Sequence, residues 1–110
     1  MPRLLAIATL LTVFSFVAAA GEWGGYLMDA MCAAKMKDKA ASHKTKCALS
    51  CAKTGYGIVT ADGKYVKFDE TGNAKAAEAL KGTAKEHDLK VKVTGTLEGD
   101  VIQVESLVIN

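Results

Sequence analysis

The sequence lacks a strong imbalance of charge, and this excludes several classes of partner. Its 14 basic residues face 12 acidic ones, which gives a formal net charge of +2. Without the first 20 residues, which include Arg3, 13 lysines remain and the charge is +1. Proteins that capture nucleic acid or an anionic membrane surface do so with a dense basic stripe. We therefore expect that this chain binds neither.

Common catalytic motifs are also missing. The chain contains no phosphate-binding glycine loop, no serine nucleophile elbow and no H-E-x-x-H zinc motif. His87 beside Asp88 could exchange protons, but no nucleophile is placed in the sequence to use the pair, so a solvated loop histidine is the simpler interpretation. The sequence therefore predicts a protein without enzymatic activity.

The apolar run near the N-terminus is too short for a membrane anchor. Residues 1–3 are short and basic, residues 4–17 are mostly apolar, and residues 18–20 are alanines suited to a signal peptidase. A bilayer span needs about 20 apolar residues, and no cysteine at the cleavage point could carry a lipid. We expect residues 1–20 to be a signal peptide and residues 21–110 to be one domain, exported to the periplasm or the extracellular space, with no membrane span.

The number of cysteines is odd, so they cannot all pair within one chain. Cys32, Cys47 and Cys51 lie within 20 residues of one another, together with His43. A helix that begins after Ser42 would bring His43, Cys47 and Cys51 to one face, at positions i, i+4 and i+8. The sequence thus predicts that the cysteines and His43 lie close together in the fold.

One interpretation of this cluster is a tetrahedral metal site. Cys32, His43, Cys47 and Cys51 form a Cys3His set, which is a common set for zinc. The spacing C-x10-H-x3-C-x3-C lacks the paired C-x2-C of the strong zinc signatures. Zinc is the predicted ion. Copper is a weaker alternative, which rests on three nearby thioethers that more often fill core gaps, namely Met28, Met31 and Met36.

The competing interpretation is a disulfide. Cysteines at i and i+4 of a helix have Cβ atoms about 5–6 Å apart, whereas a disulfide needs about 3.5–4.5 Å. A bridge from Cys32 to Cys47 or Cys51 is therefore better than one between Cys47 and Cys51. The alternative function is a disulfide-stapled ligand-binding or assembly module of the cell envelope, with one free or intermolecular thiol. Thiol redox activity is a minor option, because C-x-x-C is absent.

The chain after residue 20 alternates between strand-like and helix-like segments. Paired glycines at 24 and 25 suggest a bend in the first strand, Asp62-Gly63 suggests a hairpin, and period-two alternation marks the antiparallel terminal strands. Predicted strands are Glu22–Asp29, Tyr56–Thr60, Lys64–Phe68, Leu89–Thr94 and Val101–Ile109. Predicted helices are Ala30–Lys39 capped by Asp29, a segment from Ser42 to the closing Gly55, and Ala74–Lys81 capped by Asn73.

This order predicts a mainly β fold with some helix. It is that of a five-stranded OB-like Greek-key barrel, with a helical insertion (residues 30–54) between strands 1 and 2 and a helix between strands 3 and 4. With residues 25–32, the His43–Cys51 cluster and the terminal strands 91–96 and 102–104, the chain resembles small exported bacterial OB-like domains of unknown function. The resemblance implies the fold and carries no activity. Aromatic residues on such a barrel bind sugars or peptides in some proteins, although core packing is their commoner role.

Overall fold

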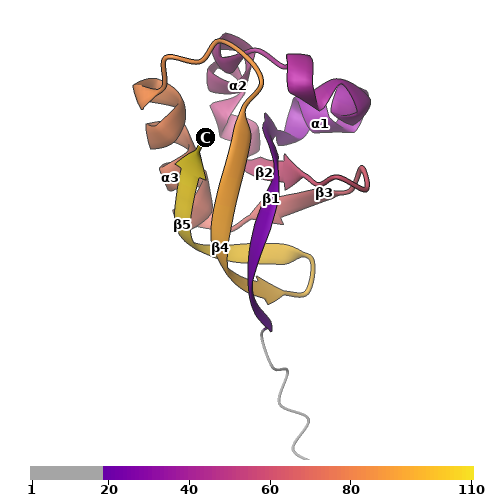
Figure 1. Cartoon of the computed structure of the whole chain (residues 1–110), viewed down its shortest axis with the longest axis vertical. Coiled ribbons are helices and arrows are strands. Elements are labelled where there is room, and N and C mark those ends of the chain that lie inside the picture. Colours follow the sequence, from indigo (N-terminus) through magenta and orange to yellow (C-terminus); the bar gives the residue numbers. More distant parts are fainter. Residues whose placement is uncertain (1–18) are drawn as a thin grey trace, which may run out of the picture.

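The computed structural model describes residues 19–110, and its five strands close into one barrel. The strand order is β1-β2-β3-β5-β4, with β4 returning to β1 (Figure 1). Neighbouring strands pair antiparallel, except for the parallel pair of β3 and β5. The strands are β1 (Ala19–Asp29), β2 (Tyr56–Val59), β3 (Tyr65–Phe68), β4 (Lys90–Glu98) and β5 (Val101–Ile109).

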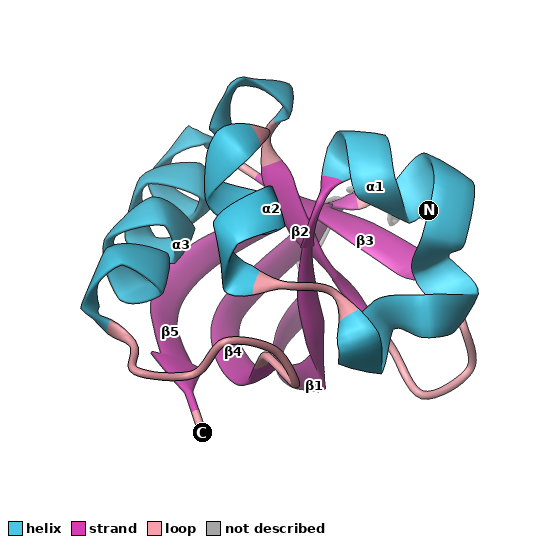
Figure 2. Cartoon of the chain, turned by 90° about the horizontal axis from the view of Figure 1, so that it is seen from above, coloured by secondary structure: helices cyan, strands magenta, loops and turns pink. Residues whose placement is uncertain are grey.

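Helices lie at one end of the barrel and along one side (Figures 1 and 2). Between β1 and β2 the chain forms α1 (Ala30–Met36), the 3₁₀ helix η1 (Lys37–Ser42), α2 (Thr45–Ser50) and the short 3₁₀ helix η2 (Ala52–Thr54). Helix α3 (Glu70–Gly82) connects β3 to β4. The predicted mainly β barrel with helices is confirmed. Within residues 19–110, no helix is both long and apolar enough to cross a membrane.

Strand β1 pairs with two different strands and leads directly into the helical insertion. It pairs with β4 along residues 19–26 and with β2 along residues 26–29, so it closes the barrel. At Gly25 an added Cβ would collide with the carbonyl of Val59, so only glycine allows the two strands this approach. Of the predicted signal peptide, residues 1–18 lie outside the described residues, while Ala19 and Ala20 begin β1.

The second half of the insertion differs from its prediction. The helix does not begin after Ser42, because α2 starts only at Thr45 and His43 has an extended backbone with φ −65° and ψ 126°. Tertiary hydrogen bonds explain this. The amide of Thr45 donates to the carbonyl of Glu86 (2.8 Å), and its hydroxyl donates to the carbonyl of Lys85 (2.6 Å). The predicted helical face that joined His43, Cys47 and Cys51 is therefore wrong.

Helix α3 begins one turn earlier than the sequence indicated. Asp69, not Asn73, is its N-cap, and the Asp69 carboxylate accepts a hydrogen bond from the amide of Gly72 (2.8 Å). The side chain of Asn73 is used across the fold, where its Oδ1 accepts from the amide of Tyr56 (2.8 Å). This contact fixes the start of β2 against α3.

Two apolar clusters hold the insertion on the barrel. The main core fills the barrel and includes Tyr56 of β2 and Ala48 of α2. A second cluster joins β1 and β2 to α1 and η1; its buried members are Met28, Ala33, Ala40 and Val59. Because both halves of the insertion contribute buried side chains, the barrel fixes the positions of α1 and α2.

Candidate metal centre

Asp29 stands at the centre of the candidate site. It is the last residue of β1, it is fully buried, and it is the N-cap of α1. Its Oδ2 accepts a hydrogen bond from the amide of Cys32 at 2.9 Å. An N-cap carboxylate and the residue three positions later lie together at the start of a helix. The cap therefore places the Cys32 side chain beside the carboxylate.

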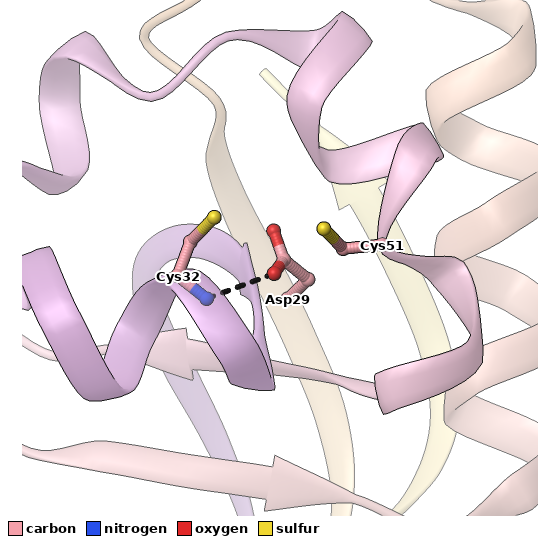
Figure 3. Close-up of side chains that lie close together, drawn as sticks. All are labelled: Asp29, Cys32 and Cys51. Atoms are coloured by element: carbon pink, nitrogen blue, oxygen red, sulfur yellow. Dashed lines mark hydrogen bonds between the residues drawn. The ribbon is translucent and has the colours of Figure 1, made fainter.

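Cys51 approaches the same carboxylate from the other half of the insertion. It follows α2 directly, where its amide donates to the Cys47 carbonyl at 3.2 Å. The Tyr56 hydroxyl donates to the carbonyl of Ala48 at 2.8 Å and ties α2 to the barrel. As a result, ligand atoms of Asp29, Cys32 and Cys51 all lie within 4.8 Å of one another (Figure 3).

His43 holds the other oxygen of the carboxylate. Its ring is buried, and Nε2 lies 2.9 Å from Oδ1 of Asp29. Because an ionised carboxylate can only accept hydrogen bonds, the ring nitrogen donates in this pair. Oδ2 accepts from the Cys32 amide and Oδ1 from the His43 ring, and a carboxylate oxygen with one such bond retains lone-pair capacity for a further partner.

The structure assembles the predicted four-residue set only in part. Cys32 and Cys51 come together, and His43 reaches them through Asp29 rather than directly. Cys47 is exposed and does not belong to the group. All three cysteines are free thiols, so the chain has no disulfide staple in this structure.

Asp29 is the site residue that sequence reasoning missed. Its capping role was predicted, but a role as a ligand was not. The local signal was present as the spacing Asp29-x-x-Cys32. The N-cap and the third helical residue share the opening turn of a helix, so an acid and a thiol at these positions are brought together.

Electrostatics at the site disfavour additional negative charge. Burial, followed by the hydrogen bond and charge of Asp29 and by Cys51, raises the pKa of the Cys32 thiol to about 11. Burial and the charge of Asp29 also raise the pKa values of Tyr56 and Tyr65. In residues 19–110 no lysine forms an ion pair with Asp29. A divalent cation would supply the positive charge that this group lacks.

The donor set suits a borderline-soft divalent ion. In a tetrahedral zinc site, bonds of about 2.3 Å to sulfur and about 2.0–2.2 Å to oxygen place ligand atoms about 3.5–3.8 Å apart. The three ligand atoms here lie within 4.8 Å of one another. Side-chain rotations that bring these atoms about 1 Å closer together would therefore reach the spacing of a zinc site. Three protein ligands leave the fourth position for water or another ligand.

The methionines give little support to copper. Met28 is fully buried and packs in the second apolar cluster, as the core interpretation of this residue predicted. Met31 and Met36 are 49% and 37% exposed, as side chains at the surface rather than in a closed ligand shell are.

Comparison with known proteins adds no relatives. No family model, curated protein or solved structure matches the chain.

Proposed function

We propose that this protein binds one zinc ion through the Asp29 carboxylate and the Cys32 and Cys51 thiolates. One observation carries the proposal: three side chains from the end of β1, the first turn of α1 and the end of α2 meet within 4.8 Å around a buried carboxylate. Buried carboxylates need partners, and the side-chain partners of Asp29 within residues 19–110 are the His43 ring and the Cys32 thiol.

His43 has the place of an outer-shell residue in this proposal. Histidine and carboxylate pairs behind a metal fix the orientation of the ligand and tune its basicity. In the common arrangement the histidine binds the ion and the carboxylate bonds to the histidine. Here the carboxylate would bind the ion, and the imidazole would hydrogen-bond to the carboxylate. The predicted ligand role of His43 thus becomes a supporting one, and Asp29 takes its place among the ligands.

Zinc fits these donors better than copper. Cu(I) favours soft thiolate and thioether ligands, whereas zinc accepts a mixture of sulfur and carboxylate oxygen. One of the three donors is a carboxylate, and the buried Met28 serves in packing. Copper remains the second ion to test.

The ion would stabilise the helical insertion between β1 and β2. It would tie the first turn of α1 to the end of α2, next to the barrel end where β1 finishes. The strand order and the helix between β3 and β4 support an OB-like fold, similar to that of small exported bacterial domains. Export to the periplasm or beyond, the lack of enzymatic activity, and a small ligand or envelope protein as partner belong to the same proposal.

Zinc binding is tested with reduced, metal-free protein. Competition with a chromophoric chelator should show one zinc ion per chain, and Co²⁺ substitution should show a thiolate charge-transfer band. Cys32→Ser, Cys51→Ser and Asp29→Asn should each weaken binding at least about tenfold. Asn at position 29 keeps a side-chain oxygen for the helix cap, so this variant is expected to fold.

Cys47→Ser is the matched control, because Cys47 is exposed and lies outside the group. It should bind zinc with the affinity of the unchanged protein. The proposal fails if the reduced protein binds no zinc at micromolar concentration. It also fails if Cys47→Ser weakens binding as much as Cys51→Ser, since the ligand set would then differ from the one proposed.

A further inference from the structure

Resting on the proposed zinc site, we infer that Cys32 and Cys51 also form a reversible disulfide, so that oxidation and zinc binding exclude each other. The substrate of this second chemistry is a small-molecule or protein disulfide. The site would then have two closed forms, one with the metal and one with a covalent bond between the same two sulfurs.

The geometry selects one pair among three cysteines. The sulfurs of Cys32 and Cys51 lie within 4.8 Å of each other, and a bond of about 2.05 Å requires them to approach by less than about 3 Å. Rotation about the Cα–Cβ bonds covers much of this distance. Cys51 follows α2 with φ −105° and ψ 22°, outside regular helix, so its backbone can also adjust.

Cys47 is placed where it cannot compete. It lies inside α2, exposed, four residues before Cys51. Helical Cβ atoms at this spacing are about 5–6 Å apart, too far for a disulfide without distortion of the helix. A bridge from Cys47 to Cys51 is therefore disfavoured by the helix, and Cys47 does not belong to the group of side chains that contains Cys32.

The thiols of Cys32 and Cys51 are accessible to a disulfide substrate. Both are half-buried, whereas Asp29 between their segments is fully buried. Figure 3 shows the two sulfurs on either side of the carboxylate, one from α1 and one from the segment after α2. An incoming disulfide can thus reach sulfur while the carboxylate stays protected.

Thiol–disulfide exchange would oxidise the two cysteines in two steps. One protein thiolate attacks a substrate R–S–S–R, forms a mixed disulfide and expels RS⁻; the second protein thiolate then attacks the mixed disulfide and expels another RS⁻. Cys32 and Cys51 lose two protons and two electrons in total, and the substrate becomes two RSH. A bound zinc ion would be released, because oxidation consumes two of its three ligands. It would leave as Zn²⁺, since the electrons pass from the thiols to the substrate disulfide.

The disulfide would take over the role of the metal as a cross-link. Either form connects the start of α1 to the end of α2, so the insertion stays on the barrel in both states. The two forms differ in the freedom of the Asp29 carboxylate, which faces an ion in one form and a covalent bridge in the other.

The test compares metal-free and zinc-loaded protein in glutathione redox buffers, with alkylation of the remaining thiols and intact-mass measurement. The metal-free protein should lose two daltons and show a Cys32–Cys51 peptide. Cys47→Ser should behave identically, while Cys32→Ser and Cys51→Ser should form no internal bridge. Zinc-loaded protein should oxidise more slowly and release one zinc per bridge formed. The affinity of the oxidised form for zinc should fall at least about a hundredfold.

The redox inference and the zinc proposal fail separately. If the reduced protein binds no zinc yet forms the Cys32–Cys51 bridge, the zinc proposal and its exclusion by oxidation are overturned. If the reduced protein binds zinc but the bridge includes Cys47, never forms, or leaves zinc bound, the redox inference is overturned and the zinc site stands.

Discussion

Replacement of Asp29 by alanine tests the central contact of the site without any metal. The change removes the carboxylate that caps α1 and that accepts from His43 at 2.9 Å. Loss of an N-cap costs about 0.5–2 kcal/mol of unfolding free energy. Because His43 is 4% exposed, its ring nitrogen is left buried without its partner, which adds about 1–3 kcal/mol. The expected total is about 1.5–5 kcal/mol.

Asp69→Ala provides the matched comparison. Asp69 caps α3, and its Oδ1 accepts from the amides of Gly72 (2.8 Å) and Val104 (3.2 Å) without a histidine partner. Loss of the cap and of the Val104 bond is expected to cost about 1–2 kcal/mol, less than at Asp29 because no buried histidine loses its partner. Asp29→Asn should cost less than Asp29→Ala, because the amide can still cap α1.

Urea unfolding of the reduced protein at neutral pH, with chelator present, measures these differences. With a slope of about 1–2 kcal/mol per molar urea, the midpoint of Asp29→Ala should fall by about 1–5 M and the slope should stay unchanged. A His43→Ala background should reduce the cost of Asp29→Ala. If Asp29→Ala costs no more than Asp69→Ala, or if the costs of Asp29→Ala and His43→Ala are additive, the contact between Asp29 and His43 does not stabilise the fold.

Three further outcomes are expected. Since the folded-state pKa of Cys32 is about 11 against an ordinary value of 9.0, the native state favours the protonated thiol; the stability this provides is complete below pH 9 and is lost as the pH rises towards 11. After allowance for solvent screening of this half-buried group, the free energy of unfolding should fall by about 1 kcal/mol over this pH range. Cys32→Ser should not show this decrease when its urea midpoints are measured over the same range. Tyr56→Phe removes the hydroxyl bonded to Ala48 and should cost about 1–2 kcal/mol in urea unfolding; an unchanged midpoint would show that this bond does not hold α2. In thermal unfolding, Gly95→Ala should lower the midpoint by several degrees because its Cβ would collide with the Gln103 carbonyl. Gly24→Ala should leave the midpoint nearly unchanged, because no residue beyond its two chain neighbours lies within 4 Å of an added Cβ.

Local signals account for the parts of the fold that could be predicted. The period-two alternation of the terminal strands gave their antiparallel pairing, which the structure confirms. Gly55 and Gly63 were predicted to end a helix and to turn a hairpin, and both have positive φ (84° and 80°). Such features depend on a few adjacent residues, so tertiary contacts rarely change them.

Predictions failed where distant residues compete for the same groups. His43 was expected in a helix, but the bonds of Thr45 to residues 85–86 and of His43 to Asp29 keep this segment extended. Asn73 was expected to cap α3, but it binds the amide of Tyr56 instead. In both cases a tertiary hydrogen bond outweighed a helix signal worth about 1 kcal/mol.

The sequence alone determined the strand pattern, the presence of a helical insertion, and the concentration of sulfur within it, because periodicity, turn residues and spacing are local properties. Only the tertiary structure decided that Asp29 would join Cys32 and Cys51 while Cys47 faced solvent. That choice depends on how α1 and α2 pack on the barrel, and a rotation of either short helix by one residue would have brought a different side chain to the carboxylate.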